Sequence, residues 1–198
     1  MVEHVVAYRG ICLSEAMEVV GNQKYLAAEE RKFRNDIEIK AVFGAGVYLV
    51  SDYTVAAEYA YCHAEANSDK GSVIRQSLCL QNPLLLDGCF GEKEIRGLAL
   101  AWKYPNGVMD EEAEEIASIG LSRWAGNIIR EYVTKLGYDG IVYHIDDTLT
   151  YYIAYKPDEQ ISAVQLDFVY DIRDIGSCTF TDLRNRYHAH MEETSVQE

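Results

Sequence analysis

The segment Gly44–Tyr59, GAGVYLVSDYTVAAEY, joins two glycines, a short β-type run and a small helix that carries tyrosines at both ends. Residues 45–51 have the content of a strand, and residues 52–67 have the composition of a helix. Because glycine has no Cβ, Gly44 and Gly46 allow another group to approach the backbone closely. The segment therefore predicts a place where the backbone can pass close to a flat ligand.

Two tyrosines give this segment its second property. Tyr48 lies on the predicted strand and Tyr59 on the predicted helix, which Ser51 or Asp52 is expected to cap through a side-chain oxygen. The two rings can face each other only if the helix folds back over the strand. In that case they can sandwich a planar, partly charged ring.

The chain has 198 residues, 48% of them apolar and 25% charged, which is typical of a globular protein. We expect a single domain over residues 1–183 and a frayed or disordered acidic tail over residues 184–198, because the tail has no core pattern. No apolar run is long enough to cross a bilayer, and the first residues do not resemble a secretory signal. We therefore expect a cytoplasmic protein, in its own cell or a host cell, with no membrane partner.

Charge and cysteine content exclude several function classes. The formal net charge of −14 argues against nucleic acid as the main partner, because such binding depends on lysine and arginine. Five cysteines form no CxxC pair and leave one over, so neither a disulfide framework nor a zinc site is predicted, and we expect no metal. The GxSxG motif of serine hydrolases and the phosphate loop of nucleotide triphosphatases are also missing.

The order of the predicted elements indicates an α+β domain and not a doubly wound parallel sheet. One broken helix or two short helices follow the first strand, and the glycine-rich middle of the chain, which includes Gly97, is predicted as loops. Three strands close the domain after one long helix. Strands are predicted over 4–11, 45–51, 71–80, 138–145, 150–156 and 162–172, and helices over 52–67 and 110–137.

Three further stretches point to a known family. They are YRGI (8–11), VIRQSLCLQNPLLLD (73–87) and GYDGIVYHIDDTLTYYIAYKPDEQI (137–161). In this order, together with Gly44–Tyr59, the chain resembles the ADP-ribosyltransferase superfamily from about residue 5 to residue 169, most closely the small members of bacterial toxins and phage-encoded proteins. The resemblance implies two small packed antiparallel or mixed sheets around an NAD cleft, with flanking helices. Gly44–Tyr59 is similar to the segment that forms the nicotinamide half of the pocket in the poly(ADP-ribose) polymerase branch.

The resemblance also implies roles for single residues. Arg9 stands where one branch of the family has an arginine and another a histidine, and it would grip the nicotinamide ribose or the phosphates of NAD. The backbone of Gly10 would hold the nicotinamide carboxamide, while Tyr48 and Tyr59 would bracket the ring. Ser51 is near a serine that has a structural role in the arginine-type branch. The expected binding set is Tyr8, Arg9, Gly10, Gly46, Tyr48, Ser51 and Tyr59.

Cleavage of the bond between nicotinamide and ribose builds positive charge on the sugar, which a carboxylate can stabilise. The family places a glutamate at the start of the strand that here reads YYIAY, and the residue in that register is Tyr151. Because a tyrosine carries no negative charge near neutral pH without a large pKa shift, either another acid assists or catalysis is weak or absent. The candidate acids are Glu159 and, in the turn before the strand, Asp146 or Asp147; the expected catalytic set is Arg9, Tyr151, Glu159 and Asp147.

Three functions follow from the resemblance. The first is a mono-ADP-ribosyltransferase that takes NAD as co-substrate and modifies a protein or small-molecule acceptor. The second is an NAD-binding or protein-binding module that has lost turnover, which Tyr151 favours, and the third is an NAD glycohydrolase. The acidic surface would suit a basic protein partner.

Overall fold

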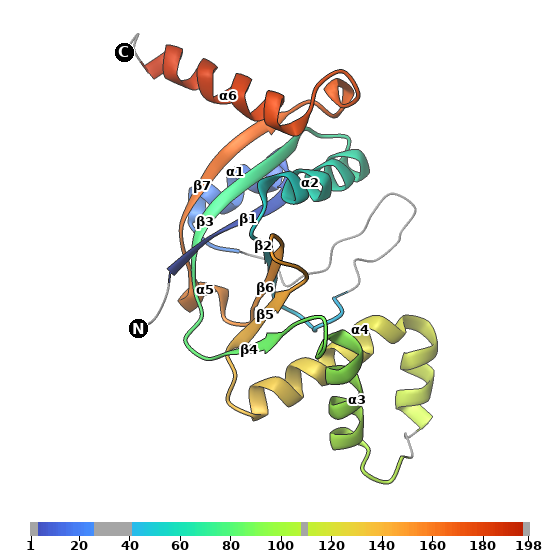
Figure 1. Cartoon of the computed structure of the whole chain (residues 1–198). Helices are drawn as coiled ribbons and strands as arrows, with labels where there is room; N and C mark the ends of the chain where they lie inside the picture. Colours follow the sequence, from blue (N-terminus) through green and yellow to red (C-terminus); the bar gives the residue numbers. More distant parts are fainter. Residues whose placement is uncertain (1–3, 26–40, 108–110, 196–198) are drawn as a thin grey trace.

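The computed structural model describes residues 4–25, 41–107 and 111–195, without the side chains of 111–121 and 194–195. Within these residues seven strands form one mixed sheet in the order β4-β5-β6-β2-β1-β3-β7 (Figure 1). The elements are β1 His4–Cys12, α1 Leu13–Asn22, β2 Val47–Val50, α2 Tyr53–Asn67, β3 Gly71–Cys79, β4 Pro83–Leu86, α3 Glu92–Lys103, α4 Glu111–Lys135, β5 Gly140–His144, β6 Thr150–Ala154, α5 Pro157–Gln160, β7 Ile161–Tyr170, the 3₁₀ helix η1 Ile172–Asp174, and α6 Phe180–Ser195. The predicted α+β class is confirmed.

The sheet consists of two parts, which we call the long half (β1, β3 and β7) and the short half (β2, β6, β5 and β4). In the long half, β1 pairs antiparallel with β3 along its whole length, and β3 pairs antiparallel with β7. In the short half, β2, β6 and β5 are antiparallel neighbours and β4 lies parallel to β5 at the edge. The halves are joined by one registered pair, Tyr8↔Val50. The prediction of two separate sheets is therefore corrected: a single pair of residues links them into one.

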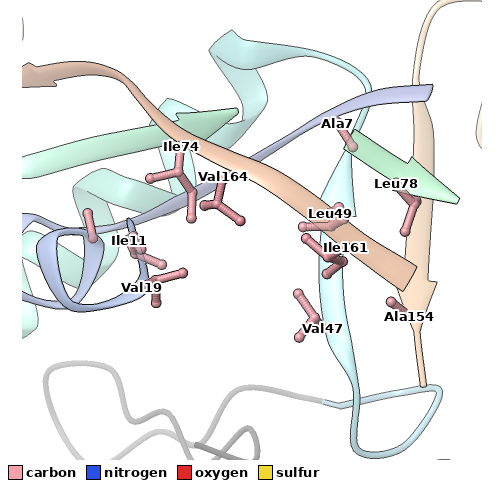
Figure 2. Close-up of a cluster of buried hydrophobic side chains, with 11 residues drawn as sticks. Ala7, Ile11, Val19, Val47, Leu49, Ile74, Leu78, Ala154, Ile161 and Val164 are labelled. Atoms are coloured by element: carbon pink, nitrogen blue, oxygen red, sulfur yellow. The ribbon is translucent and has the colours of Figure 1, made fainter. Parts of the chain in front are cut away.

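The long half is buried on one face against α1, and we call this side of the sheet the α1 face. Since side chains alternate along a strand, Ala7 and Ile11 of β1 point to this face, where they pack with Ile74, Leu78 and Val19 (Figure 2). Strands of both halves contribute to the same cluster. Its buried members are Ala7, Ile11, Ala16, Val19, Val47, Leu49, Ile74, Leu78, Ala154, Ile161 and Val164.

The opposite side of the sheet, which we call the α2 face, is covered by different helices on the two halves. On the long half, α2 and α6 bury Val73 and Phe168. On the short half, α3 and α4 pack against Ile141 and Ile153. Figure 1 shows α6 at one end of the molecule and the α3–α4 pair at the other. On this face, β2 and β6 therefore lie between the part of the sheet that α2 and α6 cover and the part that α3 and α4 cover.

The prediction of loops in the middle of the chain is wrong, because the helix α3 runs through Gly97. The backbone N–H of Gly91 donates to Glu94 Oε2 at 3.0 Å, which caps the helix start, and the apolar side chains of Ile95 and Ala99 are buried. A Cβ on Gly97 would touch nothing within 4 Å, so this glycine only lowers helix propensity. Packing of the apolar stripe outweighs that loss.

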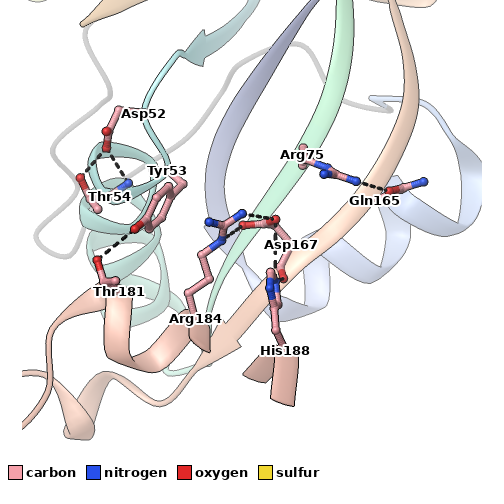
Figure 3. Close-up of polar contacts among 9 residues, drawn as sticks. All are labelled: Asp52, Tyr53, Thr54, Arg75, Gln165, Asp167, Thr181, Arg184 and His188. Carbon is pink, nitrogen blue, oxygen red and sulfur yellow. Dashed lines mark hydrogen bonds and ion pairs between the residues drawn. The ribbon is translucent and has the colours of Figure 1, made fainter. Parts of the chain in front are cut away.

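The prediction of a frayed tail from residue 184 is also wrong, since residues 180–195 form the helix α6. Arg184 holds this helix to β7 through two hydrogen bonds to the buried carboxylate of Asp167, at 2.7 and 3.1 Å (Figure 3). His188 lies one turn further on and makes a 2.7 Å contact with the Asp167 carbonyl oxygen. Leu183 is buried, and Phe180 and Tyr187 are partly buried in the same cluster, so a short apolar stripe at helical spacing holds α6 together with these polar contacts.

The longest helix agrees with its prediction. It begins at Glu111 and ends at Lys135, and Gly137 follows with a φ of +89°, the left-handed conformation expected just beyond a helix end. Asp110, the predicted first residue, lies outside the described residues. Among the described helices, none combines the length and the apolar character that crossing a membrane requires.

Candidate functional site

Helix α2 folds back over the sheet and packs mainly on β1 and β3. The hydroxyl of Tyr59, on the second turn of α2, lies 3.2 Å from the hydroxyl of Tyr151 at the start of β6. Close packing makes this approach possible: a Cβ on Gly10 would lie 1.7 Å from the carbonyl oxygen of Ala56. The lack of a side chain at Gly10 therefore sets how closely α2 approaches β1.

The start of α2 is fixed by Asp52, as predicted. Its Oδ1 accepts hydrogen bonds from the backbone N–H groups of Thr54 at 2.7 Å and Val55 at 3.0 Å, and also from the Thr54 hydroxyl. Partial burial raises the pKa of Asp52, but these hydrogen bonds outweigh it and leave the pKa below its ordinary value of 3.8. The cap is therefore a carboxylate at neutral pH.

The turn between β5 and β6 repeats the same arrangement beside it. Asp146 Oδ1 accepts from the N–H and the hydroxyl of Thr148, both at 2.7 Å, and from the N–H of Leu149 at 2.9 Å. Ser51 links the turn to the end of β2: its N–H donates to the Thr150 carbonyl and its Oγ accepts from the Thr150 N–H, both at 2.9 Å. These bonds hold the first residues of β6 in position against α2.

Tyr48 and Tyr151 lie on the same face of the sheet as Tyr59. The register pairs Tyr48 with Ile153 and Val50 with Tyr151, so Tyr48 and Tyr151 both point to the α2 face. Burial, and next the hydrogen bond to Tyr59, raise the pKa of Tyr151 far above its ordinary value of 10. Tyr151 is thus a neutral phenol at physiological pH and supplies no negative charge.

The hydroxyl of Tyr48 binds the backbone just ahead of its own strand. It donates to the Gly44 carbonyl at 2.7 Å and accepts from the Phe43 N–H at 3.1 Å. Gly44 has a φ of +84°, and a Cβ there would lie 2.6 Å from the Gly126 carbonyl oxygen of α4. A Cβ on Gly46 would lie 2.9 Å from a backbone oxygen of β6. The two glycines thus allow close packing on α4 and β6.

Arg9 lies on the α1 face, opposite to the three tyrosines. Its side chain is 4% exposed, and its NH1 donates to the Tyr48 carbonyl oxygen at 3.0 Å. Its guanidinium carbon is 5.1 Å from the ring centre of Tyr25. The predicted phosphate contact and the predicted nicotinamide contacts are therefore on opposite faces of the sheet, and they meet only where β1 joins β2.

Tyr8 and Gly10, the neighbours of Arg9, point to the α2 face. The ring of Tyr8 meets the ring of Tyr53 edge-on, with 6.2 Å between the ring centres. After the pair Tyr8↔Val50, β1 and β2 form no further registered pairs. Among the described strands, none pairs with the edge of β1 at Gly10 that faces β2.

The structure separates the two acids proposed as catalysts. Glu159 lies in α5, beyond the end of β6 that is opposite to Tyr151, with a side chain 74% exposed and 3.8 Å from Lys156 Nζ. The prediction for Glu159 is corrected, because the chain turns into α5 and β7 and does not return to Tyr151. Asp147 is exposed in the β5–β6 turn, at the same end of the strands as Tyr151.

Glu58 is a third acid that the sequence argument missed. It is exposed on α2 directly before Tyr59, and its charge contributes to the raised pKa of Tyr151. The only available signal was its position beside a tyrosine expected to stack on a ligand. The sequence does not show that Tyr59 meets Tyr151 at the start of β6, and only this contact places Glu58 near that strand.

No metal centre accompanies these residues in the described part of the chain. A search for three or more histidine, cysteine, aspartate or glutamate side chains that could hold one ion finds no such group there.

Comparisons with known proteins add little to this geometry. The sequence matches no protein-family model and no curated protein. Among solved structures, the M. tuberculosis MbcT–MbcA toxin–antitoxin complex contains a chain that superposes with a TM-score of 0.40 and 10% identity, over 93% of this chain and 91% of that chain. A superposition of this quality leaves the fold to be judged on the chain's own strands and hydrogen bonds.

Proposed function

We propose that this chain binds NAD, releases nicotinamide and transfers ADP-ribose to a protein or small-molecule acceptor. One observation carries the proposal: the hydroxyls of Tyr59 and Tyr151 are 3.2 Å apart, which brings Tyr59 of α2 to the start of β6. Tyr48 lies on the same face, one strand away from Tyr151. The resemblance to ADP-ribosyltransferases assigns Tyr48 and Tyr59 to the nicotinamide half of the site and gives Tyr151 the register of the family's catalytic glutamate.

In this proposal NAD lies at the join between the two halves of the sheet. Nicotinamide stacks on Tyr59 and Tyr48 on the α2 face, and the open edge of β1 at Gly10 offers backbone groups to its carboxamide. Arg9 lies at the same join, where its NH1 reaches the Tyr48 carbonyl, and a guanidinium suits a diphosphate because its planar fork donates parallel hydrogen bonds.

The chemistry breaks the bond between ribose C1 and the nicotinamide nitrogen. Nicotinamide leaves neutral with the electron pair of that bond, and positive charge spreads over C1 and the ring oxygen of the ribose. A lone pair of the acceptor then forms the new bond to C1, and the acceptor gives its proton to a carboxylate. Glu58 and Asp147 are the acids at the Tyr151 end of β6 that can stabilise the charge and take this proton.

Tyr151 favours a second candidate function, an NAD-binding module without turnover. Its phenol stays neutral because burial raises its pKa, so the position offers a hydrogen bond and no charge. Such a module would hold the dinucleotide through the same residues and present it to a protein partner. A glycohydrolase differs from the transferase only in that water takes the place of the acceptor.

Incubation with NAD labelled in its adenylate part separates these functions. Label on protein supports the transferase, free ADP-ribose alone supports the glycohydrolase, and saturable binding without nicotinamide release supports the module. Tyr59→Ala should weaken NAD binding about tenfold, since stacking on an aromatic ring contributes about 1–3 kcal/mol. Tyr61→Ala, two residues further along α2, is the matched control and should bind NAD like the natural chain. A natural chain that binds no NAD would refute the proposal.

A further inference from the structure

Strand β7 of the long half contains two β-bulges. The first lies between Ser162 and Gln165, where β7 has one residue more than the facing part of β3. The second is at Asp167, whose two neighbours pair with adjacent residues of β3. A bulge leaves the extra residue without a place in the ladder, so its backbone groups need other partners.

The side chain of Gln23 supplies these partners at the first bulge. Gln23 follows α1 directly, in the left-handed conformation with a φ of +54°. Its Nε2 donates to the Val164 carbonyl at 2.8 Å, and its Oε1 accepts from the Val164 N–H at 3.0 Å. A residue on a neighbouring antiparallel strand makes the same pair of bonds. Gln23 therefore takes the place of a strand partner at Val164.

The side chain of His188 fills the same role at the second bulge. Its Nε2 lies 2.7 Å from the Asp167 carbonyl oxygen, and because a carbonyl can only accept, the ring nitrogen donates (Figure 3). His188 comes from α6, which covers the α2 face, whereas Gln23 follows α1 on the other face. Helices on both faces of the sheet thus each send one polar side chain to β7.

The position of β7 makes these bonds more than local repairs. The order of the described strands ends at β7, so none of them pairs with its outer edge. An edge with free N–H and C=O groups is a template on which another chain can add a strand. β7 has ten residues, whereas the strand at the other edge, β4, has four and begins with Pro83, which has no N–H to donate. Of the two edges, β7 is therefore the one that needs closing.

The composition of β7 indicates that a second copy of this chain can pair with it. The net charge of −14 repels copies from one another in general, yet the strand ISAVQLDFVY contains one charged residue, Asp167, and Arg184 pairs with its carboxylate. Two identical strands can pair antiparallel about a two-fold axis, and strands of this composition bring no unpaired like charges opposite each other. The general repulsion is thus weak at this edge.

We propose that Gln23 and His188 keep the edge of β7 closed to a second copy of this chain, and that two copies pair β7 to β7 when these side chains are removed. The two side chains occupy the N–H and C=O of Val164 and the C=O of Asp167, which are backbone groups that a strand added at this edge would bind. The inference does not depend on the proposed function, since no ligand takes part in it.

The test is sedimentation velocity over a range of protein concentrations for the natural chain, Gln23→Ala, His188→Ala and the double variant. The double variant should form dimers with a dissociation constant about tenfold or more below that of the natural chain, because the freed backbone groups gain hydrogen bonds in the dimer. Gln23→Ala should associate more than His188→Ala, since it frees two groups and not one. Asn22→Ala and Asn185→Ala, at exposed positions of the same two helices, are the controls and should behave like the natural chain.

Amide hydrogen exchange shows where the dimer forms. Exchange at Val164 should slow in the double variant as the protein concentration rises, whereas exchange in the β1–β3 ladder should not depend on concentration. A double variant that is less stable but associates no more than the natural chain would show that the two side chains only satisfy the bulges, and the inference would be overturned. A dimer without this protection of Val164 would also overturn it. If the double variant does not fold, the two single variants decide by the same criteria.

Discussion

The two halves of the sheet hold together by different means. In the long half, β1 and β3 pair from His4↔Cys79 to Cys12↔Gly71, so continuous backbone hydrogen bonds set the geometry. In the short half, β2 and β6 pair over only four positions, Val47↔Ala154 to Val50↔Tyr151. There, side-chain hydroxyls add bonds to the backbone. The long half is thus held mainly by backbone pairing, whereas the geometry of the short half also depends on single side chains.

The hydroxyls of the short half all act near the start or the end of β2. Tyr48 binds Phe43 and Gly44, Tyr155 donates to the Phe43 carbonyl at 2.8 Å, and Ser51 binds Thr150. The candidate site residues lie where this half meets the long half, around the pair Tyr8↔Val50. The candidate site therefore lies where continuous strand pairing stops and side-chain hydrogen bonds hold the backbone instead.

We expect the largest loss of stability from Gly10→Ala, at the place where the two halves of the sheet meet. The added Cβ would lie 1.7 Å from the Ala56 carbonyl oxygen, and helix backbone cannot move aside as a flexible side chain can. We expect a loss of about 3 kcal/mol or more in unfolding free energy, at the upper end of overpacking, measured by urea denaturation. Gly21→Ala is the control, because a Cβ there meets nothing within 4 Å and alanine favours the helix. Equal stability of the two variants would mean that α2 does not rest on β1.

The second largest loss of stability should come from breaking the ion pair that holds α6 to β7 of the long half. Arg184→Met should cost about 3 kcal/mol, because it leaves the carboxylate of Asp167, with a side chain only 4% exposed, buried without its partner. Arg173→Met is the matched control: that side chain is 85% exposed beside Asp171, so its loss should change the urea midpoint little. If both variants unfold alike, the anchor that holds α6 to β7 contributes nothing.

A smaller effect should appear in the short half. Tyr155→Phe removes the hydroxyl that donates to the Phe43 carbonyl, and leaving that buried acceptor unpaired should cost about 1–2 kcal/mol. Amide hydrogen exchange should then rise in β2 and β6 but not in the β1–β3 ladder. Tyr170→Phe, which loses a 2.6 Å bond to the Ala57 carbonyl, is the counterpart in the long half. Faster exchange in the β1–β3 ladder of Tyr155→Phe would contradict the division into halves.

The same division explains what the sequence could predict. Strands and helices with an apolar period were found, and so was the cap of α2, because Asp52 followed by Thr54 and Val55 is a local signal. α3 and α6 were missed for physical reasons. Gly97 lowers helix propensity without blocking a helix, and α6 is held in part by Arg184 on Asp167, a contact with another element that no local pattern shows. The short apolar stripe of Phe180, Leu183 and Tyr187 was overlooked.

The candidate site was predictable only in part for a similar reason. The segment Gly44–Tyr59 indicated that Tyr59 faces Tyr48, whereas the hydroxyl that Tyr59 meets in the structure is that of Tyr151. Period-2 alternation alone could have placed Arg9 on the face opposite to Tyr8 and Gly10. The contribution of Glu58 depends on which elements become neighbours, and that information is not local in the sequence.

The smallest expected effect is the pH dependence of stability that the two capping aspartates, Asp52 and Asp146, contribute. Asp52 has a pKa below 3.8 in the folded state, because hydrogen bonds from Thr54 and Val55 outweigh the burial that raises it. A folded-state pKa below the unfolded value gives stability that is fully present above the unfolded pKa and is lost as the pH falls through the folded pKa. Asp52→Asn removes this titration, while asparagine still caps a helix.

We therefore expect the natural chain and Asp52→Asn to differ by less than about 1 kcal/mol at pH 7, and the difference to shift toward the variant below pH 4. Urea denaturation at pH 7, 4 and 3 measures it. Asp146→Asn makes the matching change in the exposed β5–β6 turn, where the hydrogen bonds from Thr148 and Leu149 also lower the pKa. The cap of α2 supports a helix that packs on β1, whereas the turn supports only a hairpin, so Asp52→Asn should shift the pH profile more. Identical profiles for the two variants would show that the two halves respond to their aspartate turns alike.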